Sequence, residues 1–143
     1  MKIAIMQPYL FPYIGYFQLI HSVDLFVLYD DVQYKKGGWI NRNRLLIDGK
    51  ARYFSFPVSK GASNEIIKRR EFSNLQRAFK KLSHQLQYNY PKSHFLSQLP
   101  ALLSVCADQT CVSEVLSQLI VKVNNILNIS TPINIGLQKI ATD

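Results

Sequence analysis

The chain has no long apolar run and no apolar segment at its start. Nowhere in its 143 residues do about 18 apolar residues follow one another, so the sequence predicts no membrane span. The first residues hold one Lys and then Gln7-Pro8, unlike a signal peptide. We expect a cytoplasmic protein of one domain, because this length supports one core and 48% hydrophobic content argues against disorder.

Cysteine is also scarce. Cys106 and Cys111 are the two present, which is too few for a disulfide framework. A zinc site would need His84 or His94 from another segment, so we expect buried free thiols and predict no metal site. The Walker A, G-x-G-x-x-G, H-E-x-x-H and G-x-S-x-G motifs are absent, which leaves the cofactor, if any, unassigned.

Acidic residues are few, and the net charge is +8. Between Lys35 and Lys92 the chain has 14 Lys or Arg but three acids. Such a positive middle segment suits an anionic partner, which could be a phosphorylated small molecule, a nucleic acid or an anionic membrane surface. No signature of a nucleic-acid recognition fold accompanies it, so we favour a small molecule.

The stretch MQPYLFPYIGYFQLI crowds five aromatic residues between a strand-like run at 2–6 and a short helix expected at 13–22. We expect Gln7 and Phe11, each before a proline, to be extended. A second buried strand is expected at 24–29. A strand, a special turn and a helix form the entry at which α/β proteins often bind ligands. The sequence therefore predicts an α/β fold with a Rossmann-like sheet start.

The rest of the chain predicts a β-hairpin insertion and a helical C-terminal half. Residues 45–47 and 51–58 flank an Asp-Gly turn signal, and residues 32–39 indicate a second hairpin or a glycine-hinged loop. Residues 66–72 are left without an assignment. Apolar spacing predicts helices over 75–90, 95–105 and 112–127.

Two carboxylates follow the second strand. Asp30 and Asp31 stand where a side chain can act as general base, bind a metal or orient a sugar hydroxyl. Asp is also common as a turn residue or helix cap, and position alone leaves both interpretations open. His84 lies off the apolar stripe of its helix and is a candidate for proton transfer, although a solvated helix face explains it as well.

The segment Trp39-Ile40-Asn41-Arg42-Asn43-Arg44 is a candidate for substrate binding. In an extended chain Asn41 and Asn43 share one face, and Arg42 lies on the other beside Arg44. Amides bind hydroxyls and carbonyls, and guanidinium binds phosphate or carboxylate through two bonds. Trp39 offers a stacking surface. A basic edge strand protected against aggregation is the alternative.

The pieces MQPYLFPYIGYFQLI, DLFVLYDDVQY, WINRNRLL, YFSFPVSK, SHQLQYNYPKSHF and ILNISTPI together resemble the WbqC-like protein family along essentially the whole chain. Members tend to belong to bacterial O-antigen and capsule gene sets, and they are usually longer, which implies a chain shortened at its C-terminal end. The resemblance implies an anionic ligand such as a nucleotide-sugar. The matching candidates are Gln7, Tyr9, Gly15, Tyr16, Asp30, Asp31, Gln33, Trp39, Asn41, Arg42, Asn43 and His84.

The N-terminal turn is also loosely similar to the entry of nucleotidylyltransferases, which has histidines where Tyr13-Ile14-Gly15-Tyr16 stands here. This likeness implies that Gly15 lets backbone approach the ligand and that Tyr9, Tyr13 and Tyr16 supply rings and hydroxyls. Core packing is the alternative for some of these tyrosines.

We expect a transferase that modifies an activated sugar in surface-polysaccharide biosynthesis, by acyl or aminoacyl transfer. A non-catalytic nucleotide-sugar binding module and a nucleic-acid-binding protein are the alternatives. The sequence leaves the oligomeric state open.

Overall fold

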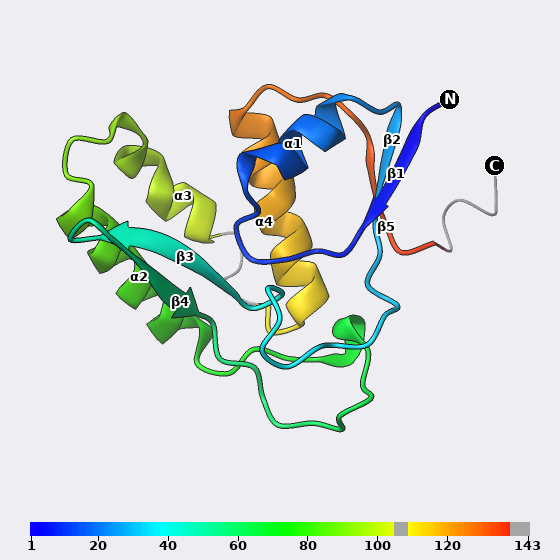
Figure 1. Cartoon of the computed structure of the whole chain (residues 1–143), viewed down its shortest axis with the longest axis horizontal. Helices are drawn as coiled ribbons and strands as arrows, with labels where there is room; N and C mark the ends of the chain where they lie inside the picture. Colours follow the sequence, from blue (N-terminus) through cyan, green and yellow to red (C-terminus); the bar gives the residue numbers. More distant parts are fainter. Residues whose placement is uncertain (105–108, 138–143) are drawn as a thin grey trace.

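The computed structural model describes residues 1–104 and 109–137, which form a three-stranded sheet, a β-hairpin and four α-helices in an α/β arrangement (Figure 1). The elements are β1 (Ile3–Met6), α1 (Ile14–His21), β2 (Leu25–Leu28), β3 (Arg42–Ile47), β4 (Lys50–Ser55), the 3-10 helix η1 (Ile67–Arg69), α2 (Leu75–Asn89), the 3-10 helix η2 (His94–Gln98), α3 (Leu99–Ser104), α4 (Val112–Ile126) and β5 (Ile133–Ile135).

The three-stranded sheet is parallel, in the order β1-β2-β5. Helices α1 and α4 lie on one side of it, where Phe26 and Leu28 of β2 pack with residues of both helices. The other face is less covered, since Ile3 and Ile5 are 41% and 50% exposed. The predicted Rossmann-like start, in which strand, turn, helix and strand follow one another, is therefore present.

The sequence predicts no counterpart of strand β5, because the last element that it predicts is the helix over 112–127. It has three residues, and its Ile133 pairs with Phe26 of β2. So short a strand has no periodicity of its own, and its partner lies more than a hundred positions earlier in the chain.

The predicted hairpin is confirmed as β3 and β4, and it begins at Arg42, earlier than expected. Its turn residues Asp48 and Gly49 have φ values of 50° and 71°, as in the type I′ turn that matches strand twist. Residues 32–39 form a loop rather than a second hairpin, tethered by a bridge between Gln33 and Ile66.

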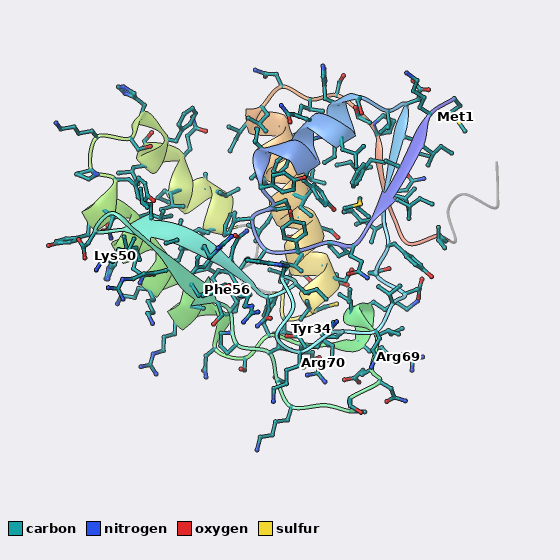
Figure 2. The ribbon with its side chains drawn as sticks, viewed as in Figure 1. Met1, Tyr34, Lys50, Phe56, Arg69 and Arg70 are labelled. Carbon is teal, nitrogen blue, oxygen red and sulfur yellow. The ribbon has the colours of Figure 1, made fainter. Side chains whose placement is uncertain are left out.

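Helix α4 joins two hydrophobic clusters. Its Ile120 packs with the three-stranded sheet and α1, whereas Val115 and Leu119 pack with the cluster around Phe56 and Phe79, which includes the inner face of the hairpin and α2 (Figures 1 and 2). The helices predicted over 75–90 and 112–127 are confirmed, and the one predicted over 95–105 is divided into η2 and α3.

Three further predictions can be compared with the structure. Phe11 has φ of 46° rather than an extended conformation, so the turn before Pro12 is strained. Cys111 is a free thiol but is only partly buried, and Cys106 lies outside the described residues. Within residues 1–104 and 109–137, no helix is long and apolar enough to cross a membrane.

Candidate functional site

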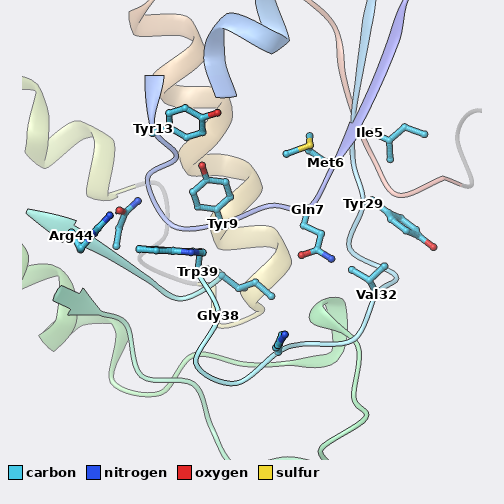
Figure 3. A pocket seen from close by; sticks show the side chains of 13 residues that line it. Ile5, Met6, Gln7, Tyr9, Tyr13, Tyr29, Val32, Gly38, Trp39 and Arg44 are labelled. Atoms are coloured by element: carbon cyan, nitrogen blue, oxygen red, sulfur yellow. The ribbon is translucent and has the colours of Figure 1, made fainter. Parts of the chain in front are cut away.

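A pocket of about 880 Å³ lies beyond the carboxyl ends of β1 and β2, in the range of small-molecule sites (Figure 3). Its wall combines the N-terminal turn, the segment after β2 and the start of the hairpin. The lining residues are Ile5, Met6, Gln7, Tyr9, Tyr13, Tyr29, Val32, Lys35, Gly38, Trp39, Ile40, Asn43 and Arg44.

Aromatic side chains form one side of this pocket. Figure 3 shows Tyr13, Tyr9 and Trp39 one below another. The edge of one ring in the Tyr9 and Tyr16 pair meets the face of the other, with centroids 5.3 Å apart, so Tyr9 is held against the core. Tyr13 and Trp39 are 69% and 44% exposed, so each keeps part of its ring surface open to a planar or sugar ligand.

Gly15 makes room for one of these aromatic rings, that of Tyr13. A Cβ at this position would collide with the ring of Tyr13, so the absence of a side chain lets that ring lie across the first turn of α1. We predicted from the sequence that Gly15 would let backbone approach a ligand. In the structure the close neighbour is the tyrosine that lines the pocket.

Positive charge stands at the rim of the pocket. The guanidinium carbon of Arg44 lies 5.3 Å from the Trp39 ring centroid and 5.9 Å from that of Tyr53. Neither ion pair that the described chain forms involves Arg44 or Lys35. Arg42 lies over the same two rings but donates to the carbonyl of Gly37. Arg44 and Lys35 are therefore the basic groups placed to meet an anion.

Asn43 lines the pocket, but its amide is occupied within the protein. Nδ2 donates to the carbonyls of Leu10 and Phe11 at 3.0 and 2.6 Å, and Oδ1 accepts from the Arg44 backbone N–H at 2.8 Å. These bonds connect the hairpin to the strained turn at Phe11. Asn43 thus positions the two walls of the pocket relative to each other.

Gln7 reaches into the same space (Figure 3). Its backbone carbonyl accepts a hydrogen bond from the hydroxyl of Tyr16 at 3.0 Å. Tyr16 is buried, and burial raises its pKa above the ordinary value; burial also raises the pKa of Tyr9. Tyr16 therefore packs behind Gln7 and Tyr9 and does not itself line the pocket.

The two carboxylates predicted as catalytic lie outside the lining. Asp30 is 5% exposed and accepts a hydrogen bond of 2.5 Å from the hydroxyl of Ser113, in the first turn of α4. Asp31 forms an ion pair with Lys68. Asp30 therefore connects the end of β2 to α4, and a catalytic role for either carboxylate stays a prediction.

The remaining sequence candidates are separated from this pocket. Asn41 donates to the Phe56 carbonyl at 2.8 Å, and Gln33 donates to the Ser63 carbonyl at 2.7 Å. His84 is exposed on α2 and does not line the pocket. Among the described residues, no group of three or more His, Cys, Asp or Glu side chains is arranged to hold a metal ion.

Five of the candidates predicted from the sequence come together here: Gln7, Tyr9, Tyr13, Trp39 and Asn43. The prediction did not single out Tyr29, Lys35 or Arg44 as binding residues, although Arg44 ends the candidate segment that begins at Trp39. Arg44 directly follows Asn43 in that segment, and Lys35 lies two residues before Gly37 in the basic stretch. Either position in the sequence could have indicated a ligand-binding residue. The sequence predicts Tyr29 as the last residue of the second buried strand, whereas β2 ends at Leu28.

Comparison with known protein families confirms the resemblance seen in the sequence. The WbqC-like protein family matches residues 7–141. The chain belongs to the WbqC-like family. It is similar to "Uncharacterized protein Rv1507c" of Mycobacterium tuberculosis (strain ATCC 25618 / H37Rv), with 43% identity over 68 residues. That match covers 47% of this chain and 29% of the relative. No solved structure matches.

Proposed function

We propose that this WbqC-like protein binds a nucleotide-sugar in the pocket at the sheet end and transfers an acyl or aminoacyl group to the sugar during surface-polysaccharide biosynthesis. One observation carries the proposal. A pocket large enough for a small molecule places exposed aromatic faces beside basic side chains that form no ion pair within the described chain.

The chemistry of the lining supports a phosphorylated, ring-containing ligand. The guanidinium of Arg44 lies beside the neighbouring rings of Trp39 and Tyr53, which limits its motion and leaves N–H groups available for a phosphate. Lys35 adds a second positive charge, and no Asp or Glu lines the pocket. Tyr13 and Trp39 offer ring faces for a base or sugar.

Transfer in this pocket would depend mainly on orientation. The titratable side chains that line it are three tyrosines, Lys35 and Arg44, and burial raises the pKa of Tyr9, which keeps that hydroxyl protonated and able to donate. Holding a sugar amine or hydroxyl against the carbonyl carbon of an acyl ester or thioester promotes attack by proximity. The new C–N or C–O bond replaces the bond to the donor's alcohol or thiol, which leaves with the proton of the nucleophile. Gln7 is available to orient such a group, since Figure 3 shows its side chain within the pocket.

A non-catalytic binding module is the second candidate. The observation that favours it is the position of Asp30 and Asp31, because neither carboxylate lines the pocket. Such a module would bind the same nucleotide-sugar without turnover.

The test is calorimetric titration of the purified chain with a panel of nucleotide-sugars, comparing Arg44→Gln with Arg52→Gln. Arg52 is exposed on β4 and does not line the pocket, so it matches the charge change. A charge-assisted hydrogen bond contributes about 1.5–3 kcal/mol, so Arg44→Gln should weaken binding roughly 10- to 100-fold, with Arg52→Gln close to the parent.

Turnover then separates the two candidates. Incubating the best-binding nucleotide-sugar with acyl-thioester or aminoacyl donors and following sugar mass should reveal an acylated product. Tight binding without product would favour the binding module. Equal losses in the two Arg variants, or binding of an oligonucleotide alone that disappears on adding salt, would refute the assigned site.

A further inference from the structure

A second pocket, of about 520 Å³, also borders the hairpin. Adjacent residues of β3 contribute to the two pockets, since Asn43 and Arg44 line the first and Leu45 lines the second. The lining residues of the second pocket come from the hairpin, the end of α2, the η2 and α3 segment and the end of α4, elements whose arrangement Figure 1 shows. Its lining residues are Leu45, Leu86, Tyr90, Ser93, Phe95, Leu96, Gln98, Leu99, Leu102, Ile126 and Leu127.

The lining of this second pocket is mostly aliphatic. The hydroxyl of Tyr90 donates to the Leu46 carbonyl at 2.8 Å and accepts from the Leu46 N–H at 3.1 Å, so it is already occupied. At the mouth, Phe95, Leu127 and Ile126 are 66%, 41% and 37% exposed. Leaving apolar area in water costs about 25 cal/mol per Å², a cost that an apolar ligand would remove.

The charged residues on the helical elements around this pocket are mostly basic, which favours an anionic head on that ligand. Residues 75–104, which supply α2, η2 and α3, contain no Asp or Glu. Lys92 stands just before the η2 segment, and Lys122 precedes Ile126 by one turn of α4. The acid of α4, Glu114, lies at its other end, roughly 18 Å away along the axis.

We propose that this second pocket binds one linear acyl chain carrying an anionic head, with the chain among the leucines and the head toward Lys92 and Lys122. The volume lies within the range of small-molecule sites. The two pockets share no lining residue, so this proposal does not rest on nucleotide-sugar binding.

The test uses monomeric straight-chain fatty acids as probes, measured by displacement of a fluorescent polyene fatty acid. Ile126→Asp places a carboxylate at the mouth and should weaken binding at least 10-fold. Val121→Asp is the matched control, because Val121 is also 37% exposed on α4 and does not line the pocket. Each added methylene should tighten binding about fourfold until the pocket is filled.

Absence of saturable binding, or equal losses in the two Asp variants, would overturn the proposal. So would binding to anionic lipid vesicles without binding to monomeric fatty acid. A dimer in sedimentation that Ile126→Asp dissociates would assign the pocket to a second copy instead. If Ile126→Asp does not fold, Leu127→Asp replaces it, since Leu127 is more exposed. Nucleotide-sugar titration of the same variants should be unchanged, which keeps failure here distinct from failure of the proposed function.

Discussion

Asn43→Ala should destabilise the fold more than it weakens any ligand contact. The variant removes two hydrogen bonds from Nδ2 to the Leu10 and Phe11 carbonyls and one accepted from the Arg44 N–H. Each bond contributes about 1 kcal/mol net, and polar groups left without a partner add to the loss. Because Phe11 sits at a positive φ that the surroundings must hold, we expect a total near 3 kcal/mol.

The measurement is urea unfolding followed by circular dichroism, with a graded series for comparison. Asn41 makes one side-chain hydrogen bond, to the Phe56 carbonyl, so Asn41→Ala should cost about 1 kcal/mol. Asn64 is exposed on the loop, so Asn64→Ala should be nearly neutral. The loss of unfolding free energy should be largest for Asn43→Ala, smaller for Asn41→Ala and smallest for Asn64→Ala. The slope of that free energy against urea concentration should be the same in all three variants.

A different order would refute the reasoning. If Asn43→Ala unfolds at the same urea concentration as Asn64→Ala but loses nucleotide-sugar affinity, the amide contacts ligand and the turn is held by other groups. If both stability and affinity fall, binding measured well below the unfolding transition decides between them, because a positioning role lowers affinity through displacement of the pocket walls.

Three further substitutions test the neighbouring contacts. Ser113→Ala leaves the buried Asp30 without this donor and should cost about 1–3 kcal/mol in urea unfolding; a neutral result would mean that Asp30 has another partner. Gly15→Ala should leave stability within about 1 kcal/mol, since Ala favours the helix and the exposed Tyr13 ring can swing aside, but should alter nucleotide-sugar affinity by titration. For Tyr16→Phe, the unfolded chain loses this proton near the ordinary pKa of 10.0 while burial keeps it in the fold, so stability should fall as pH rises above 10. In urea unfolding at alkaline pH, the variant should lose stability less steeply, by up to about 1.4 kcal/mol per pH unit. An unchanged dependence of stability on pH would contradict the raised pKa of Tyr16.

Local signals predicted the elements that depend on local chemistry. The Asp48-Gly49 turn needs positive φ at two successive residues, and few dipeptides supply that, so the hairpin could be placed from the sequence. Helices α2 and α4 carry strong apolar periodicity. Strand β5 depends instead on pairing with β2, and the Phe11 conformation depends on the bonds from Asn43, so neither has a local signature.

The residues of the candidate site also differ in whether local sequence or distant partners determine their positions. Aromatic residues of the N-terminal turn could be predicted to gather because the turn itself brings them together. The carboxylates after β2 could not be placed, because their direction depends on distant residues: Ser113 for Asp30 and Lys68 for Asp31. Position at a strand end fixes where a backbone lies, whereas the partners that the fold supplies fix where a side chain points.

The direction of these carboxylates also determines the charge of the pocket. With Asp30 and Asp31 engaged elsewhere, the charged side chains of the lining are Lys35 and Arg44. A positive pocket selects for an anionic ligand and would lose that selectivity if either carboxylate turned inward, because a charge of the opposite sign within about 4–6 Å would neutralise the guanidinium field. Recognition of phosphate and acid–base catalysis by Asp therefore compete for the same space. Because neither carboxylate lines the pocket, the proposed transfer relies on orientation of the ligand, and a catalytic role for Asp30 or Asp31 stays a prediction.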